Sequence, residues 1–416
     1  MSGALRRSFS SLEIPNYRRY FVGQIVSVSG TWVQTVAETW LVLQLTGSGF
    51  AVGVAAALQF APMLLAGAWG GAIADRFPKR RLLTTTQLAM ALPALTLFAL
   101  TASGAIALWM LYLLIFARGV VLAVDNPARQ AFLVELVGPA RVLNAVSLNS
   151  ALINSARIIG PAIAGVLITT VGVAPCFAVN AVSFLAMIAA LRRMDGRQLT
   201  PTPVTERAPG QVRGALRYVR ATPELWIPLA LTAVVGTFTF NFQILLPLLA
   251  DFTFHGDAGV YATLTTAMGI GAIAGAIANG SRARVRPALL VSAALAFGAL
   301  MVALATAPSE LLAVVVLVPV GAASVAFSAS VNSALQLAVD PAMRGRVMAL
   351  YSVVFLGSTP IGAPLMGWLA NAAGPRAAFL LGGLVAIAAG LAARAAFARA
   401  GVPARTPLGA PEHVAA

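Results

Sequence analysis

Four charged residues interrupt the long apolar runs of this chain and are the first candidates for chemistry. Glu38, Arg118, Arg157 and Asp125 are each embedded in mostly apolar sequence. A charge inside a membrane-spanning helix is costly unless it faces water or a partner, so such residues are functional candidates by default. Glu38 could take up and release a proton, because burial and a nearby arginine affect its ionisation in opposite directions. The alternative for Glu38 is hydration close to the outer surface.

The other three charges also have alternative interpretations. Arg118 and Arg157 lie deep in predicted helices, and for Arg157 a structural ion pair is as good an interpretation as a role in coupling. Asp125 is expected at the end of a helix beside Asn126, where it would belong to a cytoplasmic gate. We therefore treat Glu38, Arg118, Arg157 and Asp125 as candidates for proton coupling, with Glu38 as the carrier.

The elements that must position these residues are membrane-spanning helices. Of the 416 residues, 59% are hydrophobic and only 10% are charged, whereas a soluble domain has about 25% charged residues. The apolar runs reach the roughly 20 residues that a helix needs to cross the bilayer, and they are too long for barrel strands of about ten residues. We predict an all-α membrane protein with twelve transmembrane helices, at residues 20–45, 50–73, 80–102, 106–127, 143–170, 173–191, 225–250, 258–279, 287–306, 310–337, 346–372 and 375–398.

The composition also disfavours several functions. The formal net charge of +15 does not indicate nucleic-acid binding, because the charges cluster between the apolar runs. The single cysteine, Cys176, excludes an internal disulfide, and His255 and His413 fall in a predicted loop and in the tail, so no metal site is expected. The chain has no Gly-x-x-x-x-Gly-Lys loop for ATP, and no cofactor is expected. Without histidine in any predicted helix, we do not expect an enzyme.

The positions of the arginines predict the orientation of the helices. Basic residues precede the first helix and lie between the second and third, fourth and fifth, eighth and ninth, and tenth and eleventh helices, while the opposite loops hold Asp251, Asp257 and Glu310. Because basic loops remain in the cytoplasm, we expect both termini there, in a multi-pass protein of the cell inner (plasma) membrane.

The chain divides into two related halves joined by a basic linker. Gly71–Asp75 matches Gly275–Asn279, and Ile159–Gly165 matches Ile361–Gly367, at offsets of roughly 200 residues. Duplicated halves of this kind place a substrate site between them near mid-membrane. In the linker, the segment from Val212 has apolar residues along one helical face and predicts a short helix at the membrane surface. The predicted parts are an N-terminal segment (1–19), a first half (20–191), the linker (192–224), a second half (225–398) and a tail (399–416).

Several amide side chains also lie within the predicted helices. Lipid cannot satisfy their hydrogen bonds, so some of them must face a wet cavity. Trp32, Trp40, Phe238, Phe240 and Phe242 could line an apolar part of the same cavity, although most aromatic residues are expected to be packing. The candidates for the substrate cavity are Gln34, Asn149, Asn154, Asn241, Gln243 and Asn332.

A short basic loop after the second apolar run carries the clearest motif. The segment reads Gly71-Ala-Ile-Ala-Asp75-Arg76-Phe-Pro-Lys-Arg80-Arg81. Its pattern resembles the loop between the second and third helices of the major facilitator superfamily, although Pro78 stands where that family often has glycine. The resemblance implies that this loop stabilises one state of a transporter, so Gly71, Asp75, Arg76, Arg80 and Arg81 are assigned to gating.

Two further motifs resemble the same superfamily. Arg118-Gly119 resembles a fourth-helix signature whose arginine is linked to proton movement. Gly160-Pro161-x-x-x-Gly165 resembles the fifth-helix signature of the antiporters, and ordinary packing of small residues is the alternative. Longer stretches, including Trp40–Gly47, Asp125–Phe132 and Asn144–Ser150, resemble the transmembrane secretion effector branch over about residues 15–395.

These resemblances imply a major facilitator fold and a secondary active transporter. We expect it to export a small amphipathic molecule, such as a siderophore, a secondary metabolite or a drug, by alternating access. Protons, the substrate and the lipid bilayer would be its partners, with the protein acting as a monomeric proton antiporter. The alternative is a nutrient importer or uniporter on the same fold.

Overall fold

The computed structural model describes residues 9–138, 141–200, 211–279, 286–340 and 343–404. In these ranges all the regular secondary structure is helical, so the predicted all-α class is confirmed. The chain forms two compact units. The first comprises Met1–Gly47, Leu58–Thr205 and Asp257–Thr266, and the second comprises Ser48–Ala57, Glu206–Gly256 and Ala267–Ala416.

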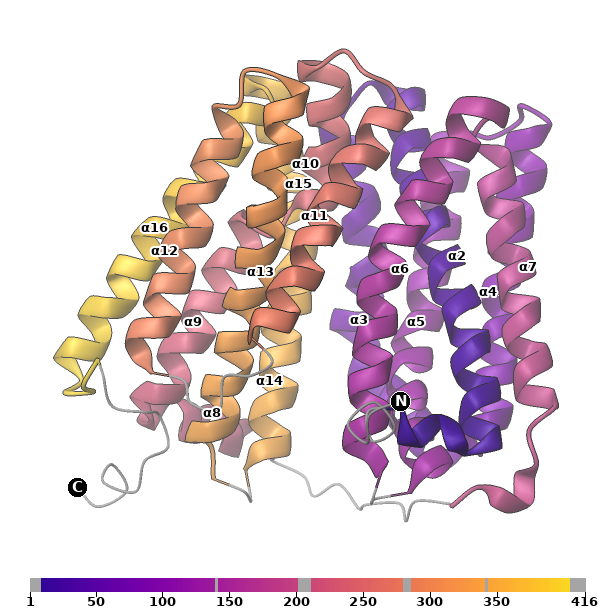
Figure 1. Ribbon diagram of the computed structural model, residues 1–416, viewed down its shortest axis with the longest axis horizontal. Helices are drawn as coiled ribbons and strands as arrows, with labels where there is room; N and C mark the ends of the chain where they lie inside the picture. Colours follow the sequence, from indigo (N-terminus) through magenta and orange to yellow (C-terminus); the bar gives the residue numbers. More distant parts are fainter. Residues whose placement is uncertain (1–8, 139–140, 201–210, 280–285, 341–342, 405–416) are drawn as a thin grey trace. The chain divides into compact units, whose positions relative to one another are not determined.

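The first unit is built mainly from long, unbroken helices. A short 3-10 helix (Ser10–Glu13) precedes α2. Helix α2 packs on α5, α6 and α7, and α4 packs on α5 and α7 (Figure 1). The first residues of α3 cluster with the second unit, whereas the first residues of α11 cluster with this one. The helices are α2 (Pro15–Thr46), α3 (Gly49–Arg76), α4 (Lys79–Ala102), α5 (Leu108–Val137), α6 (Val142–Val171) and α7 (Ala174–Arg192).

The second unit contains shorter helical pieces. Helix α12 packs on α13 and α16, and α16 also packs on α9 (Figure 1). The predicted linker helix is present as α8, which contacts α9 and α14, whereas its place at the membrane surface stays a prediction. The helices are α8 (Gln211–Ala221), α9 (Pro223–Phe238), α10 (Phe242–Leu248), α11 (Ala258–Asn279), α12 (Pro287–Ala305), α13 (Glu310–Ala338), α14 (Arg344–Gly357), α15 (Thr359–Ala373) and α16 (Pro375–Arg399).

Eleven spans in the described part of the chain are long and apolar enough to cross a membrane. Two of them, Pro223–Thr253 and Arg344–Ala373, each contain more than one helix of the second unit. The first predicted span, within α2, falls outside this set although α2 has 32 residues. The reason is its polar content. Thr31, Thr35 and Thr39 each donate to a carbonyl one turn earlier in α2, which satisfies their hydroxyls inside the helix.

The seventh and eleventh predicted helices are not continuous, which corrects the sequence prediction. In the first of these, the helix stops at Phe238 and resumes at Phe242. The Asn241 side chain replaces a lost backbone bond, because its Nδ2 atom donates to the Thr237 carbonyl four residues earlier (2.7 Å). Thr239 Oγ1 donates to the Gly382 carbonyl of α16 (2.8 Å). The second interruption lies at Ser358, between α14 and α15.

The fourth predicted helix is longer than expected. It was predicted to end at residue 127, but α5 continues through Pro127 to Val137. A proline in a helix removes one backbone hydrogen bond and need not end the helix in a packed bundle. Asp125 and Arg129 therefore lie inside α5, where we expected a helix end and a loop.

Candidate functional site

The centre of the first unit holds a buried ion pair between α2 and α5. Glu38 is 3% exposed and Arg118 is 1% exposed. Arg118 Nη2 donates to Glu38 Oε2, and Gln34 Nε2 donates to Glu38 Oε1 at 2.7 Å. Both carboxylate oxygens therefore receive a hydrogen bond. Within the described residues, the Nε and Nη1 atoms of Arg118 have no hydrogen-bond partner.

The network continues from Glu38 to α7. Asn180 Nδ2 donates to Gln34 Oε1 at 2.5 Å, and Ser183 Oγ lies 2.8 Å from Asn180 Oδ1 and 2.7 Å from the Asn180 carbonyl oxygen. Gln34, Asn180 and Ser183 are almost completely buried. The structure thus places Gln34, predicted to line a substrate cavity, between Glu38 and Asn180.

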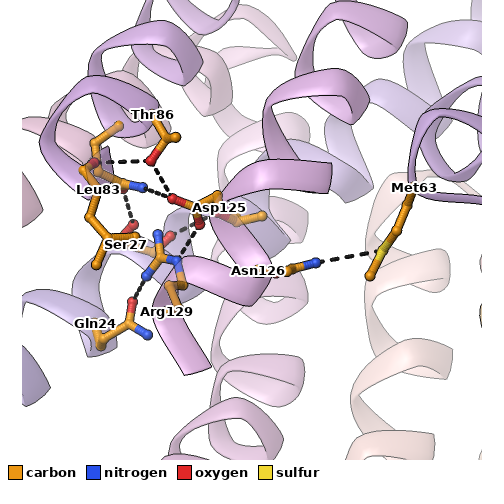
Figure 2. A network of polar contacts seen from close by, with 10 residues as sticks. Gln24, Ser27, Met63, Leu83, Thr86, Asp125, Asn126 and Arg129 are labelled. Atoms are coloured by element: carbon orange, nitrogen blue, oxygen red, sulfur yellow. Dashed lines mark hydrogen bonds and ion pairs between the residues drawn. The ribbon is translucent and has the colours of Figure 1, made fainter. Parts of the chain in front are cut away.

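A second buried network surrounds Asp125 on the same helices (Figure 2). Thr86 Oγ1 and Gln87 Nε2 of α4 donate to Asp125 Oδ1 at 2.5 and 3.0 Å, and Arg129 pairs with Asp125 Oδ2 one turn along α5. Arg129 also donates to Gln24 Oε1 of α2. Asp125 is 1% exposed. Both oxygens of this buried carboxylate therefore receive hydrogen bonds from side chains.

The two networks follow the same helix faces. In α2 the polar residues lie at 24, 27, 31, 34 and 38, a spacing of three and four residues that places them on one face. In α5, Arg118 and Asp125 are seven residues apart, which corresponds to about two turns, or roughly 10 Å along a helix. Unit 1 therefore contains two stacked carboxylate–arginine sites.

Arg157 lies apart from the hydrogen bonds around Glu38. It is exposed on α6, and its guanidinium carbon lies 5.7 Å from the centre of the Trp32 ring on α2, in cation–π geometry. A side chain at Gly160, one turn further along α6, would collide with Trp32 Cβ, so the missing side chain lets the helices meet there. Helix α6 runs through Pro161, and Gly165 faces Ala262 at the start of α11.

The predicted gating loop is reduced to Phe77 and Pro78 between α3 and α4. Asp75 is half-buried, Arg76 and Arg81 are exposed, and Gly71 is buried. Arg80 donates to the Arg192 carbonyl at the end of α7 (3.1 Å). Arg80 thus connects the start of α4 to the end of α7.

The remaining amide candidates are spread over both units. Asn149 and Asn154 lie half-buried on α6, and Asn154 donates to the Ser150 carbonyl. In the second unit, Gln243 is half-buried and Asn332 accepts a hydrogen bond from Gln336. Asn241 is 1% exposed, and its Oδ1 atom has no partner among the described residues.

Phe240, in the interruption between α9 and α10, is the centre of an aromatic cluster. Its ring lies 5.1 Å from that of Phe297, 5.6 Å from Phe355, 6.2 Å from Phe327 and 6.4 Å from Phe242, measured between centroids. Phe240 itself is only half-buried. That Phe240 and Phe242 line an apolar part of a substrate site stays a prediction.

Several members of the buried networks were not candidates from the sequence. Ser183, Gln24, Thr86 and Gln87 were missed, although the three-and-four spacing of polar residues in α2 could have indicated Gln24. For α4 and α7, no signal in the sequence identifies which of many polar residues face α2. In the described part of the chain, no group of three or more His, Cys, Asp or Glu residues is placed to hold a metal ion.

The fold defines the class of protein. A bacterial homologue of the lysosomal transporter Spinster superposes with a TM-score of 0.69 at 14% identity, covering 92% of this chain and 96% of that one. A peptide transporter of the POT family gives 0.75 at 13% identity, covering 94% and 96%. At such low identity these likenesses show the fold alone, which is that of the major facilitator transporters. The predicted fold class is confirmed.

The sequence identifies the family within this class. The family profile described as transmembrane secretion effector matches residues 6–406, so the chain belongs to that family. It is 30% identical to the staphyloferrin A transporter of Staphylococcus aureus over 61% of this chain and 64% of that protein. It is 29% identical to the multidrug efflux pump Tap of Mycolicibacterium fortuitum (85% and 88% covered) and 27% identical to the enterobactin exporter EntS of Citrobacter koseri (91% and 90%). The protein is therefore a multi-pass transporter of the bacterial inner membrane.

Proposed function

We propose that this protein exports a small amphipathic molecule by alternating access and exchanges it for protons. Membership of a family of secretion effectors supports transport, and three relatives are a siderophore transporter, a siderophore exporter and a drug efflux pump. A siderophore, a secondary metabolite or a drug is the proposed substrate class. The one-sided distribution of arginines supports cytoplasmic termini.

The observation that carries the proton-coupling proposal is the buried Glu38–Arg118 pair. Glu38 can lose its proton while Arg118 and Gln34 donate to it, and it can take up a proton when its side of the unit is exposed to the outer solution. The Nε and Nη1 atoms of Arg118, which have no partner among the described residues, provide donors for a water molecule or a substrate oxygen when Glu38 becomes neutral. Burial makes each state costly without its partners, which links protonation to a change of structure.

We assign supporting roles to the other charged candidates. The hydrogen bonds around Asp125 hold α2, α4 and α5 together. Asp125 itself is a second carboxylate for proton coupling, on the cytoplasmic side of Glu38. Asp75, Arg76, Arg80 and Arg81 act in gating, with Gly71 allowing close packing. Arg157 is exposed beside Trp32, a position suited to binding the aromatic or anionic part of a substrate.

The remaining polar candidates are proposed to contact substrate. In the first unit these are Asn149 and Asn154, with the Gly160–Gly165 segment of α6 as an antiporter-like packing element. In the second unit, Asn241, Gln243 and Asn332 would supply hydrogen bonds, and Phe240 an apolar contact. The half-buried positions of Gln243, Asn332 and Phe240 support this assignment.

The test is export from proteoliposomes with an imposed pH gradient, using enterobactin, staphyloferrin A and a lipophilic fluorescent dye as probes. For a transported probe, Glu38→Gln should abolish the response to the pH gradient, and Arg118→Ala should reduce gradient-driven export at least about tenfold, equivalent to roughly 1.4 kcal/mol. Thr96→Val is the matched control, because Thr96 is exposed on α4 and bonds only within its own helix.

The outcomes separate the alternatives. Full gradient-driven export by Glu38→Gln with an unchanged pH profile would remove Glu38 from the mechanism and make Asp125 the candidate. Uptake of a probe in the same direction as proton flow would support the importer alternative. Transport without any response to the gradient would support a uniporter.

A further inference from the structure

The hydrogen bonds around Glu38 have one common direction. Arg118 Nη2 and Gln34 Nε2 both donate to the carboxylate, and Asn180 Nδ2 donates to Gln34 Oε1. Each of these three N–H groups is thus directed toward Glu38 along the series of hydrogen bonds. Such an arrangement fits an ionised carboxylate, which can only accept hydrogen bonds.

A protonated Glu38 does not fit this arrangement. Its new O–H group needs an acceptor, but the two neighbouring groups that it meets are donors. Turning the Gln34 amide by half a rotation brings Gln34 Oε1 to Glu38 and Gln34 Nε2 to Asn180. Two amide donors would then face each other, unless Asn180 turns as well and presents its Oδ1 atom.

The consequence reaches α7. A turned Asn180 directs its Nδ2 atom toward Ser183 Oγ, which can accept, while the Ser183 hydroxyl donates to the Asn180 carbonyl as it already can at 2.7 Å. This part of α7 lies against Gly30 of α2. A side chain at Gly30 would collide with Ser183 Oγ and come within 2.8 Å of Asn180 Oδ1. The contact between α2 and α7 therefore contains the groups that must rearrange.

We propose that Gln34, Asn180 and Ser183 are positioning residues that sense whether Glu38 is protonated and transmit that state from α2 and α5 to α7. This inference deepens the proposed function by assigning the residues that couple Glu38 to the α2–α7 contact. It gives Gln34 a role different from contact with substrate.

Other charged and titratable groups near Glu38 are accounted for. Arg118 from α5 is its ion-pair partner, and Arg157 from α6 interacts with Trp32 instead. From the start of α11, Tyr261 stacks on Trp40, with ring centroids 6.3 Å apart. Cys176 lies on α7 one turn before Asn180 and is buried. From α4, Gln87 bonds with Ser27 and Asp125 and is uncharged.

The experiment measures protonation directly and needs no substrate. Infrared difference spectra of the purified protein, recorded across a pH series, detect the C=O stretch of a protonated carboxyl group, and the component absent in Glu38→Gln belongs to Glu38. Gln34→Met keeps the side-chain size and removes the donor, so the midpoint of this component should move upward by about one pH unit. Asn180→Leu should move it upward by about half as much, because it leaves Gln34 without an anchor.

Two further measurements keep the test decisive. Thr96→Val should leave the midpoint of the Glu38 component unchanged. Ser183→Ala should reduce the shift that the Gln34 and Asn180 amide signals undergo between low and high pH. An unchanged midpoint in both folded Gln34→Met and folded Asn180→Leu would overturn the relay. If Glu38→Gln keeps full gradient-driven export while both midpoints move, the relay stands and the proposed antiport fails, so the two failures are distinguishable.

Discussion

The two compact units place their polar groups in different ways. Among the described residues, every buried charged side chain belongs to the first unit, and these are Glu38, Lys79, Arg118, Asp125 and Glu135. The buried polar side chains of the second unit are hydroxyls and one amide, at Thr232, Thr239, Asn241, Ser324, Ser330 and Ser358. In the described part of the chain, buried ionisable side chains are thus confined to the first unit.

The helices differ along with the side chains. In the first unit, α2, α5 and α6 run for 32, 30 and 30 residues without interruption. In the second, α13 runs for 29 residues, but two spans break, at Thr239–Asn241 and at Ser358. Side chains at these breaks donate to the carbonyls of Gly382, Thr237 and Phe355. Long rigid helices can hold buried charges at fixed distances, and broken helices provide places where a segment can reorient.

The largest expected effect tests whether the charges of the first unit are there for stability. Arg118→Met leaves Glu38 buried without its ion-pair partner, so the free energy of unfolding should fall by about 3–5 kcal/mol. Thr232→Val, in the second unit, removes only a hydroxyl that bonds to the Pro228 carbonyl, and should cost about 1 kcal/mol or less. Chemical denaturation in detergent, followed by circular dichroism, measures both.

A double variant sharpens this prediction. Glu38→Gln combined with Arg118→Met removes both charges, and most of the lost stability should return because no buried charge remains unpaired. The response of transport to a pH gradient should stay absent. If Arg118→Met lowers the free energy of unfolding no more than Thr232→Val does, the buried ion pair does not stabilise the fold as predicted.

A smaller effect is expected at the second carboxylate. Asp125→Asn should lower the unfolding free energy by about 1–3 kcal/mol, because Arg129 is partly exposed and keeps its bond to Gln24. Transport should slow, but its response to a pH gradient should remain as long as Glu38 is intact. Loss of that response in a folded Asp125→Asn protein would place the proton carrier at Asp125.

In the second unit, a substitution should change the affinity for substrate and leave the pH dependence of transport unchanged. Asn241→Leu removes a buried amide whose oxygen has no partner in the described part of the chain, and should raise the KM for a transported probe about threefold to tenfold, the range of one hydrogen bond. The pH profile should keep its midpoint. Thr237→Val is the control, since its hydroxyl bonds only to the Ala233 carbonyl. A shifted pH midpoint in Asn241→Leu would contradict the division of roles.

The sequence predicted the helical spans well because apolar runs of the necessary length have few alternatives in a membrane. It failed where tertiary contacts decide the backbone. Pro127 was expected to end a helix, but packing carries α5 ten residues beyond it. The interruption at Thr239 was not predictable, because its hydroxyl bonds to the Gly382 carbonyl of α16, which only the folded unit brings near. At Ser358, the nearby Pro360 was a signal that the prediction overlooked.

The site was predictable in part for a similar reason. Glu38 and Arg118 were identified because a charge in an apolar run has no inexpensive position except beside a partner. Their pairing follows from α2 packing on α5, which the sequence alone does not determine. Ser183 and Thr86 are hydroxyl residues like many others in these helices, and their importance comes only from which atoms they face.

The smallest functional effect is expected from single cysteines that test whether both units have the same orientation. Ser103→Cys and Thr306→Cys lie at exposed ends of α4 and α12, and Arg81→Cys and Arg286→Cys lie at the opposite, basic ends of the same helices. The native Cys176 is buried and should not react. Because Ser103, Thr306 and Arg286 are surface positions outside the proposed gate, their cysteine variants should transport within about twofold of the wild type. Arg81→Cys lies in the gate and is used for labelling alone. In intact cells an impermeant thiol reagent should label positions 103 and 306, whereas positions 81 and 286 should react only after permeabilisation. The reverse pattern in both units would invert the proposed orientation, and different patterns in the two units would show that the arginine distribution does not determine their common topology.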